Sequence, residues 1–582
     1  MRGLTRRWIH RQGGAETAAA RGGLFERILR VRGLEDPDAI RRFCEPKLTD
    51  LHEPDLLPNI DAAADRLAEA VRQDQSIVIY GDYDVDGITA CAILYHVIKA
   101  VAPDARLGTY VPHRLEEGYG LNTEALRQLK DQGAQLIVSV DCGITALEPA
   151  AEARAIGLDL IVTDHHLPDS NEPLPSALAI VHPRLGGSRY PFGELCGAGV
   201  AWKLAWKFAT TWCGSRRVGK NVQKVLLDML PMAALGTIAD VVPLVDENRT
   251  IASFGLRWIK QTPLVGLQAL IEASGLTGED IDSEKVGFVL APRLNACGRM
   301  GHAAEAVRLL TDAPPDEAGE IARRLTGLNR QRQEIERRIT DQATQRAEDA
   351  GMTGDDCRAI VLADDSWHAG VVGIVCSRLV GRYGRPVVLL QQQGDVCTGS
   401  ARSIEGYSIH EGLTAASQHL TSFGGHEAAA GLELPGANVE AFTAALVEHA
   451  NAHISVEQLT PTLTIDCDAG LQELDLSTVR RIRTLSPFGQ ANPTPTVRIA
   501  NATVAEPPKQ IGANGRHLTL RLQVDDGARR RSLRTVWFGA GSRAGDLASG
   551  MKLDVVIEPK INAWNGRESV EGMIRDVRVH ES

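Results

Sequence analysis

Five short apolar runs, separated by longer segments of helical character, constrain what the first third of this chain can fold into. The runs are IVIY at 77–80, LGTYV at 107–111, LIVSV at 136–140, LIVT at 160–163 and LAIV at 178–181. The helix-like segments between them lie around 88–100, 123–132 and 146–155. Continuously apolar strands that alternate with helices are typical of a parallel sheet covered on both faces. The sequence therefore predicts an α/β domain, followed by helices over 197–240.

Acidic and imidazole side chains cluster where three of these strands end. The first strand runs into the acidic loop GDYDVDG at 81–87, and the strand at 136–140 ends at Asp141. The strand at 160–163 ends at the triplet Asp-His-His. In an open parallel sheet, ligands bind outside the carboxyl ends of the strands. We therefore expect these side chains to meet at one edge of the sheet.

The mixture of side chains at this edge favours a divalent metal. Carboxylates together with imidazole suit Mn²⁺ or Mg²⁺ better than a metal that prefers thiolates. So many acids packed together would repel one another strongly without a cation. A pair of divalent ions about 3.5–4 Å apart can activate a water and stabilise the charge on a phosphate under attack. The strand ends therefore predict a two-metal site for phosphate chemistry.

Each of these residues taken singly also has a structural interpretation. Asp86 is well placed to cap the helix that begins GITACAILYH, and Asp141 before Cys-Gly fits a turn. A lone His165 or His166 is more often a hydrogen-bonded loop residue than a ligand. Asp240 closes the apolar segment LGTIADVVPL and is either a buried cap or a further ligand. The coincidence at three strand ends is what favours a functional site.

The rest of the chain divides into further segments. Residues 315–350 carry few helix breakers and predict a long connecting helix. AIVLAD at 359–364 and RPVVLLQ at 385–391 begin a second α/β unit, and alternating segments from 460 onward predict a small β-barrel or sandwich. The predicted domains are an N-terminal helical segment (1–60), the first α/β domain (61–312), the connecting helix (313–350), the second α/β domain (351–456) and the β domain (457–582).

Composition excludes several classes of protein. No apolar run reaches the ~18 residues that a membrane span requires, and no apolar stretch follows the basic residues at the start, so secretion is not expected. The ten cysteines form no CxxC pair, which disfavours a disulfide framework or a Cys-rich zinc site and suits a reducing cytoplasm. A net charge of -11 argues against a wholly basic surface.

The β domain differs from the rest of the chain in charge. From 496 to 582 it carries 14 Lys and Arg against 10 Asp and Glu. The candidate contacts to a phosphate backbone there are Arg516, His517, Arg521, Arg529, Arg530, Arg531 and Arg534. Trp537, Phe538 and Trp564 lie nearby in sequence, and cations interspersed with aromatic rings suit a single nucleic-acid strand. Trp537 and Phe538 fit the core of an ordinary hairpin equally well.

A series of motifs resembles the DHH phosphoesterase superfamily. YGDYDVDG, VDCG, TDHH and GTIADVVPL occur in the order typical of that superfamily. Five further segments look like parts of its bacterial single-stranded-DNA exonucleases: PRLNACGRMGHA (292–303), WHAGVVGIVCSRL (367–379), GSARSIEG (399–406), SFGGHEAAAG (422–431) and LSPFGQANPTP (485–495). The resemblance implies a DHH domain with a parallel sheet, joined by a long helix to a DHHA1-like α/β domain. A C-terminal OB-like β-barrel opens at LSPFGQANPTP.

The resemblance also implies roles for individual residues. The implied metal ligands are Asp82, Asp84, Asp86, Asp141, Asp164, His165 and Asp240. Asp141 would bridge two ions, and His166 would face the scissile phosphate, so that His166, Asp164 and His165 form the catalytic group. Asp82 and Asp164 either bind metal or orient the residues that do. The implied nucleic-acid contacts outside the β domain are Arg293, Arg299, Ser400, Arg402, Gly424, Gly425 and His426.

The function implied is a 5′→3′ exonuclease that degrades single-stranded DNA to 5′-mononucleotides by two-metal hydrolysis. It would act in the cytoplasm in DNA repair and recombination. Its cofactors would be two Mn²⁺ or Mg²⁺ ions, and single-stranded-DNA-binding protein and a helicase are its expected partners. The alternatives are a DHH phosphohydrolase acting on small nucleotides or short oligonucleotides, and a non-catalytic DNA-binding protein. The β domain argues against the first, and the intact acidic motifs argue against the second.

Overall fold

The structure of the protein is a computed structural model. The structure describes residues 1–582 except 12–21, 115, 170, 526–529, 565 and 581–582. The chain forms two compact units. We call Glu45–Gln333 together with Ser486–Pro493 the first unit. The composite unit consists of Met1–Cys44, Glu334–Leu485 and Thr494–Ser582.

The first unit is built on a fully parallel sheet, as predicted. Its strands are β2 (Ile77–Gly81), β3 (Leu107–Tyr110), β4 (Leu136–Val140), β5 (Asp159–Thr163) and β6 (Ala179–Val181). They lie in the order β3-β2-β4-β5-β6. From β2 the chain crosses first to β3 on one side and then to β4 on the other. The order of the strands therefore reverses between β2 and β4, where ligands bind in folds of this kind.

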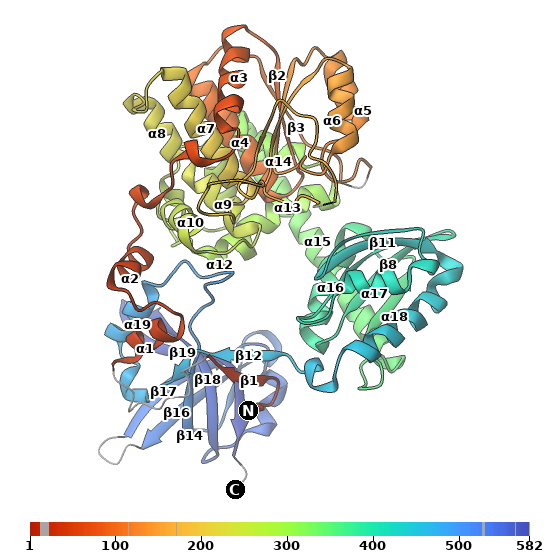
Figure 1. The fold of residues 1–582 in the computed structure, drawn as a ribbon. Helices are drawn as coiled ribbons and strands as arrows, with labels where there is room; N and C mark the ends of the chain where they lie inside the picture. Colours follow the sequence, from red (N-terminus) through yellow and green to blue (C-terminus); the bar gives the residue numbers. More distant parts are fainter. Residues whose placement is uncertain (12–21, 115, 170, 526–529, 565, 581–582) are drawn as a thin grey trace. The chain divides into compact units, whose positions relative to one another are not determined.

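Helices cover both faces of this sheet (Figure 1). Side chains of β2, β4 and β5 that point to one face pack on α3 (Ile60–Arg72), α4 (Val85–Val101) and α7 (Gly197–Cys213). Alternate side chains of the same strands point to the other face and pack on α5 (Thr123–Asp131) and α6 (Leu147–Ala155). Burial on both faces explains why these strands are apolar throughout.

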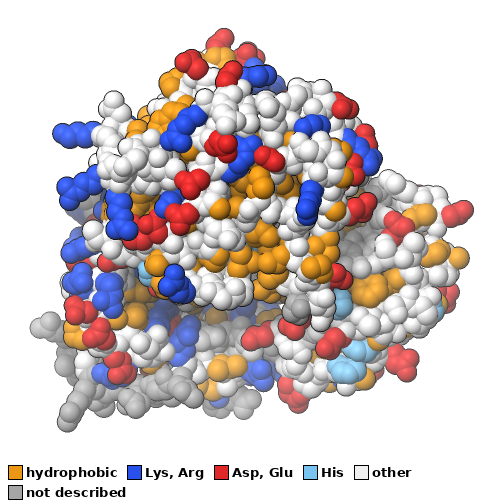
Figure 2. All heavy atoms as spheres, turned by 45° about the horizontal axis from the view of Figure 1, so that its top comes forward, with side chains coloured by type: hydrophobic (Ala, Val, Ile, Leu, Met, Phe, Trp, Pro, Cys, Tyr) orange, Lys and Arg blue, Asp and Glu red, His pale blue; other side chains and the backbone are white. Residues whose placement is uncertain are grey.

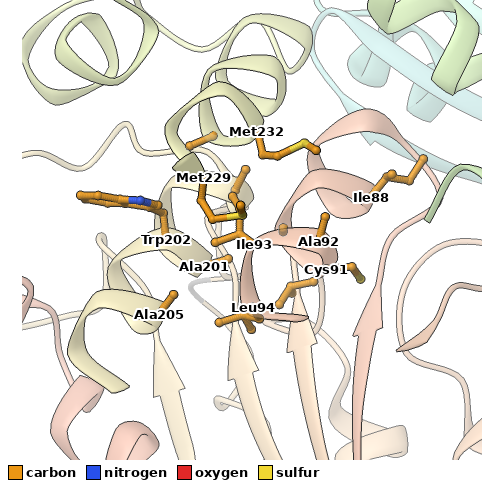
Figure 3. Packing of buried hydrophobic residues seen from close by; sticks show 14 of the residues in the cluster. Ile88, Cys91, Ala92, Ile93, Leu94, Ala201, Trp202, Ala205, Met229 and Met232 are labelled. Atoms are coloured by element: carbon orange, nitrogen blue, oxygen red, sulfur yellow. The ribbon is translucent and has the colours of Figure 1, made fainter. Parts of the chain in front are cut away.

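An all-helical layer completes the first unit. Residues 197–240, predicted to be helical, form α7, α8 (Lys220–Asp228) and α9 (Leu230–Ala239). Figure 3 shows Ile93 of α4, Trp202 of α7 and Met229 at the start of α9 within one apolar cluster. Further helices of this unit are α10 (Asp246–Trp258), α11 (Val265–Ala273), α12 (Ser283–Lys285), a π-helix (Val286–Leu290), α13 (Ala291–Met300) and α14 (Ala304–Thr311).

One stretch, Lys220–Ala239, is long and apolar enough to cross a membrane by length and composition alone. It comprises two helices, α8 and α9, which are separated at Met229. In α9 the residues from Leu230 to Thr237 are buried in the first unit. Burial inside a helical layer is what a core helix requires, so this stretch is no sign of a membrane span.

The second α/β domain has a mixed sheet. Its strands are β7 (Ile360–Asp364), β8 (Val387–Gln393), β9 (Val396–Arg402), β10 (Ser422–His426) and β11 (Ala429–Pro435), in the order β10-β11-β9-β8-β7. Only β7 and β8 are parallel. Helix α16 (Ala369–Tyr383) packs on β8 and β9, while α17 (Ile409–Ala415) and α18 (Val439–His453) pack on the core formed by the other face. The predicted connecting helix is α15 (Pro315–Asp349).

The C-terminal domain is a seven-stranded sheet. Its strands are β13 (Cys467–Asp468), β14 (Val497–Val504), β15 (Lys509–Ile511), β16 (His517–Asp525), β17 (Arg530–Trp537), β18 (Lys552–Trp564) and β19 (Arg567–Val579). The order is β13-β14-β18-β19-β17-β16-β15, and β16 pairs a second time with β14. Each of the five strands from β14 to β16 in this order is thus paired on both sides, which leaves few exposed strand edges. Helix α19 (Leu476–Arg483) packs on β18 and β19.

The N-terminal residues pack on this β domain. Strand β1 (Arg7–His10) pairs in parallel with β12 (Thr462–Ile465). The fully buried carboxylate of Asp576 accepts hydrogen bonds from the backbone N–H groups of Thr5 and Arg6 and from the indole of Trp8. Helices α1 (Leu24–Val31) and α2 (Pro37–Cys44) follow. These contacts explain why Met1–Cys44 belong to the composite unit.

The surface charge is mixed. On the face that Figure 2 shows, Lys and Arg side chains are interspersed with Asp and Glu side chains. This distribution agrees with a net charge of -11. Phosphate binding therefore has to rest on particular groups of residues.

Candidate metal centre and nucleic-acid surface

The predicted ligands converge at the point where the strand order reverses. Asp82 and Asp84 follow β2, Asp141 follows β4, and His165 lies just beyond β5. The Nε2 atom of His165 lies 3.2 Å from Oδ1 of Asp141 and 3.6 Å from Oδ2 of Asp240. The side chains form three groups, and within each group the ligand atoms lie no more than 4.8 Å apart. The groups are Asp82 with Asp84 and Asp141, Asp86 with His165 and Asp240, and Asp141 with His165 and His166.

The residue that caps helix α4 is Asp84. Its Oδ1 accepts hydrogen bonds from the N–H groups of Asp86 (2.9 Å) and Gly87 (3.2 Å). The side chain of Asp86 turns to α7, where the N–H groups of Gly197 (2.6 Å) and Ala198 (2.8 Å) donate to it. The positive end of α7 therefore faces this buried carboxylate. The capping interpretation of Asp86 is wrong, because the motif places the cap two residues earlier.

Among the residues that the structure describes, three buried atoms at this edge have no hydrogen-bond partner: Oδ1 of Asp82, Oδ1 of Asp141 and Nε2 of His165. Burying such a group without a partner is costly. The two carboxylate oxygens can only accept a hydrogen bond or bind a cation. A divalent cation would satisfy all three atoms, so the residues fit the metal that the donor set predicts.

The backbone around the cluster allows very little space. Asp141 adopts a left-handed conformation, with φ of 62°, which is strained for a residue with a side chain. A Cβ at Gly197 would lie 2.5 Å from Oδ1 of Asp141, and a Cβ at Gly236 would lie 2.4 Å from Oδ1 of Asp86. Only glycine allows α7 and α9 to approach these carboxylates so closely.

Burial and mutual repulsion shift the pKa values of the cluster. Burial, reinforced by Asp84, raises the pKa of Asp82 well above its usual range. Burial and the charges of Asp86 and Asp84 do the same to the pKa of Asp141, and they raise the pKa of Asp240 to about 9. Burial lowers the pKa of His165 to about 4, so its imidazole is neutral at physiological pH. A bound cation would favour the ionised form of these carboxyl groups and would accept the lone pair of the neutral imidazole.

Asp164 and His166 form an ion pair beside the cluster. Asp164 accepts hydrogen bonds from the N–H groups of Ile144 (2.9 Å) and His165 (2.7 Å) and from Nδ1 of His166 (2.8 Å). Burial opposes ionisation of Asp164, but these donors lower its pKa to about 2. Burial also opposes the charge on His166, yet the bond to Asp164 raises its pKa to about 9. Both oxygens of Asp164 already have donors, which favours its orienting role.

Several polar residues near the cluster were not predicted. The hydroxyl of Tyr119 lies 3.2 Å from the carbonyl oxygen of Asp141 and 3.1 Å from Nδ1 of His166. The guanidinium of Arg114 lies 4.6 Å above the ring of Tyr83. Arg114 and Tyr119 both come after β3 in the chain, but neither directly follows the strand, so their position was only a weak signal.

Four of the predicted phosphate contacts share one face of the second α/β domain. In the sheet, Arg402 pairs with Ala429, which pairs with His426; Ser400 pairs with Gly431, which pairs with Gly424. Residues directly opposite one another point to the same face, as do residues two apart on one strand. Ser400, Arg402, Gly424 and His426 therefore form one group, which we call the β9–β10 strip. Gly431 and Ala429 lie between them, so the side chains in the middle of the strip are small.

Helix α16 approaches one end of the β9–β10 strip. A Cβ at Gly373 would lie 3.1 Å from Oγ of Ser400 and 3.2 Å from Nη2 of Arg402. Arg402 also donates through Nη1 to the carbonyl oxygen of Ala401 (2.8 Å). Gly425 in β10 has a φ of 141° and a Cβ there would meet the backbone of β11, so this position in the strand requires glycine.

The other predicted arginines lie in different environments. On α13 of the first unit, Arg293 donates to the carbonyl oxygen of Val289 (2.6 Å) and to Oγ1 of Thr326 (3.2 Å). Arg299 lies at the C-terminal end of the same helix. Arg293 and Arg299 thus belong to the first unit, whereas the β9–β10 strip belongs to the composite unit.

In the C-terminal domain the candidate residues divide between surface and core. Arg521 and Arg534 lie opposite each other on β16 and β17, and they pair with Glu506 (2.9 Å) and Glu571 respectively. Arg516 is exposed. Trp537 is buried, whereas Phe538 is exposed and lies against the ring of His517. Arg529 and the side chains of Arg530 and Trp564 lie outside the described residues.

Comparison with known proteins agrees with this arrangement. The chain matches the DHH family N-terminal domain over residues 76–237, the DHHA1 domain over 356–452 and the RecJ OB domain over 465–576. It is 38% identical over 560 residues to the single-stranded-DNA-specific exonuclease RecJ of Bacillus subtilis, covering 96% of this chain and 68% of that protein. The corresponding protein of Thermus thermophilus is 35% identical over 526 residues, covering 90% of this chain and 72% of that protein. The chain belongs to the RecJ family.

Solved RecJ structures share the fold. The structure of RecJ from Thermus thermophilus with Mn²⁺ superposes with a TM-score of 0.80 at 31% identity, covering 99% of this chain and 80% of that one. The same protein with Mg²⁺ gives a TM-score of 0.74 at 29% identity, covering 99% of this chain and 79% of that one. The predicted family, fold class and enzyme class are therefore confirmed, and the RecJ OB match confirms the OB-like domain.

Proposed function

We propose that this chain is a 5′→3′ exonuclease that hydrolyses single-stranded DNA to 5′-mononucleotides. Membership of the RecJ family supports the substrate and the reaction class. The observation that carries the proposal is the set of three buried, unpartnered ligand atoms of Asp82, Asp141 and His165 at the switch point of the sheet. A site of this kind needs a cation, and a cation beside a phosphodiester supplies hydrolytic chemistry.

The proposed ligands of two Mn²⁺ or Mg²⁺ ions are Asp82, Asp84, Asp86, Asp141, His165 and Asp240. When bound, such ions lower the pKa of a water and neutralise charge on the phosphate. Asp141 and His165 each belong to two of the three ligand groups. Of the two, Asp141 would be the ligand shared by both ions, because a carboxylate offers two oxygens. The titles of the RecJ structures that match this chain name Mn²⁺ and Mg²⁺, which supports this choice of metals.

The chain's own residues would hold a positive charge against the phosphate. His166 is protonated at neutral pH because its ion pair with Asp164 raises its pKa to about 9. An imidazolium donor beside the scissile phosphate would stabilise the charge that builds up there. Asp164, fixed by backbone N–H groups, orients the ring. The hydroxyl of Tyr119 lies near the same ring and limits its rotation.

Directionality requires recognition of a strand end, which metal ions alone cannot supply. The β9–β10 strip offers a hydroxyl, a guanidinium and an imidazole on one face, and these suit a terminal phosphate. A terminal phosphate carries more charge than an internal diester, so it would be preferred. We therefore assign Ser400, Arg402, Gly424, Gly425 and His426 to the 5′ end, with Arg293 and Arg299 as further phosphate contacts.

The C-terminal domain would bind the strand away from the cut. Arg516 and Phe538 are exposed on it and suit phosphate contact and base stacking. Arg521, Arg530 and Arg534 are proposed contacts as well. A hydrolase of small nucleotides has no use for this second surface, so we do not favour that alternative.

The cellular setting is part of the same proposal. An enzyme that consumes single strands depends on proteins that generate and cover them, so a helicase and single-stranded-DNA-binding protein are its expected partners. The ten cysteines are all free thiols in the structure, which suits a cytoplasmic role in DNA repair and recombination. Co-purification with each partner, with and without DNA, would test this part.

One assay tests the activity. Long single strands, duplexes and dinucleotides are digested in parallel during an Mn²⁺ titration, and single strands are also blocked at one end or the other. We expect metal-dependent release of 5′-mononucleotides from single strands with an open 5′ end. Digestion from the 3′ end would contradict the polarity. Efficient cleavage of dinucleotides with little of long strands would favour the small-substrate alternative.

A further inference from the structure

A segment of eight residues belongs to a different unit from the residues that flank it in the chain. Ser486–Pro493 pack with the first unit, although the residues on both sides of them, up to Leu485 and from Thr494, belong to the composite unit. We call Ser486–Pro493 the strap. It lies between helix α19 and strand β14 of the C-terminal domain, so the chain leaves that domain at Leu485 and returns to it at Thr494.

Hydrogen bonds fix the strap to the first unit. Arg249, which is 2% exposed, donates to the carbonyl oxygens of Ser486 (2.7 Å) and Pro487 (3.5 Å). Oγ of Ser283 donates to the carbonyl oxygen of Phe488 (2.6 Å). The backbone N–H of Leu244 donates to the carbonyl oxygen of Gln490 (2.8 Å). Four backbone carbonyls within five residues are thus bound by the first unit.

The strap lies on the loop that follows Asp240. Gly489 approaches so closely that a Cβ there would lie 2.7 Å from Cδ1 of Leu244, a residue with 2% exposure. Leu244 is four residues beyond Asp240, and Arg249 lies in the first turns of α10. The strap therefore packs against the loop between α9 and α10, at the end of the loop nearer to α10.

This loop is strained. Val241, next to Asp240, has a φ of 61° and is 63% exposed. Asp246, at the other end of the loop, has a φ of 46°. A β-branched residue rarely adopts the left-handed region, and such conformations persist only where the surrounding structure enforces them. Asn248 provides part of the constraint by donating to the carbonyl oxygens of Pro243 (3.1 Å) and Glu194 (2.5 Å).

We propose that the strap is a positioning element of the metal centre: it holds the strained loop so that the Asp240 carboxylate stays against His165. The proposal rests on the function proposed above. Helix α9 is fixed by its buried residues up to Thr237, so Asp240 at its end is where the chain would first relax. Relaxation would move Oδ2 of Asp240 away from Nε2 of His165, 3.6 Å distant. Arg249, Ser283 and Gly489 are then positioning residues for a metal they do not touch.

Metal binding by the metal-free, full-length protein tests the strap directly. Arg249→Lys removes the forked donor while keeping the charge, and Ser283→Ala removes one donor. Arg385→Lys and Ser549→Ala are matched controls, because these side chains also donate to backbone carbonyls but lie in the composite unit. Free Mn²⁺ is followed by electron paramagnetic resonance. We expect the two strap variants to bind Mn²⁺ about 10-fold more weakly, with DNA binding in the absence of metal unchanged and the controls like wild type.

A second pair of variants decides the matter even if Arg249→Lys fails to fold. Gly489→Ala places a methyl group against Leu244 and should weaken Mn²⁺ binding in the same way. In a Leu244→Ala background, where the clash is absent, the same change should cause no further loss. Unchanged Mn²⁺ affinity in folded strap variants, or equal losses from Gly489→Ala in both backgrounds, would overturn the strap's role. Failure of the wild type to bind Mn²⁺ would instead overturn the proposed function itself.

Discussion

Nε2 of His165 and Oδ1 of Asp141 face each other at 3.2 Å, both are buried, and neither has a hydrogen-bond partner in the described part of the chain. Because burial lowers the pKa of His165 to about 4, the ring is neutral at physiological pH. A cation placed between Nε2 and the carboxylate oxygen would bind both atoms. This pair is the smallest part of the cluster that fits a metal ion.

Removing the charge of Asp141 should abolish hydrolysis and stabilise the metal-free protein. Its carboxyl group is buried beside Asp86 and Asp84, which raise its pKa together with burial. Asp141→Asn keeps the shape of the side chain and removes the charge. We expect no measurable turnover, DNA binding like that of wild type, and a higher unfolding temperature at pH 8 without metal. Thr163→Ser, a small change on the neighbouring strand, is the control for folding. Turnover by purified Asp141→Asn would contradict the assignment.

The metal-free protein should lose stability as pH rises from 7 to 9. The raised pKa of Asp240, about 9, means that the folded state holds a proton that the unfolded state has already released. The raised pKa of His166, also about 9, acts in the same direction, because its ion pair is lost as pH rises through that value. The opposite effect of His165 is complete below pH 7.

Thermal unfolding at several pH values, with and without Mn²⁺, checks this linkage. We expect the unfolding temperature to fall by several degrees without metal, since ~1 kcal/mol corresponds to about 2–4 °C in a unit of this size. The stabilisation by Mn²⁺ should grow with pH, because bound metal favours the ionised carboxylates. A metal-free protein that becomes more stable between pH 7 and 9 would be inconsistent with the cluster.

The ion pair of Asp164 and His166 should set the upper limit of the pH–rate profile. Asp164→Asn removes the charge that keeps His166 protonated, and the pKa of His166 should fall toward the ordinary value of ~6.5. The loss of activity relative to wild type should then be about 10-fold or more greater at pH 8.5 than at pH 6.5. Tyr119→Phe, which keeps the ion pair, should leave the shape of the profile unchanged. A loss that is equal at the two pH values would mean that Asp164 acts in another way.

Sequence periodicity found the sheet and most of the cluster because parallel strands deliver their carboxyl ends to one edge. It could not distinguish the roles of Asp84 and Asp86, since the donors that bind Asp86 come from Gly197 and Ala198, more than a hundred residues later. Tyr119 was missed because it lies in a loop well beyond the end of β3. The motif of the strap predicts only the opening of the OB-like domain, because a motif in sequence carries no information about which unit it packs on.

Arg402 should determine the preference for a 5′-phosphate. It lies beside Ser400 and in register with His426 across the β9–β10 strip. Arg402→Ala should raise KM for 5′-phosphorylated strands about 10-fold or more, because losing a charged hydrogen bond costs ~1.5–3 kcal/mol. The preference over a 5′-hydroxyl should shrink with it. Arg382→Ala, on α16 of the same domain, is the matched control. A phosphate preference that survives in Arg402→Ala would remove the strip from end recognition.

Substitutions in the C-terminal domain should change the salt dependence of DNA binding. For each phosphate of a single strand that the variant no longer neutralises, the slope of log K against log salt should fall by ~0.7. We expect this reduction for Arg516→Ala, which is exposed. Arg521→Ala and Arg534→Ala should have smaller effects, because each arginine must first leave its glutamate. Point substitutions are preferable to deleting the domain, since deletion would also remove the strap and the partner of β1. Slopes identical to that of wild type in all three variants would show that this surface does not contact the phosphates of the DNA.

The most direct test of the metal centre is anomalous diffraction from crystals of the full-length protein grown with Mn²⁺. Two peaks about 3.5–4 Å apart are expected, with Asp141 in contact with both and His165 in contact with one. The same preparation should degrade single-stranded DNA. A protein that degrades single strands but shows no Mn²⁺ at Asp141 and His165, or shows it elsewhere, would contradict the account.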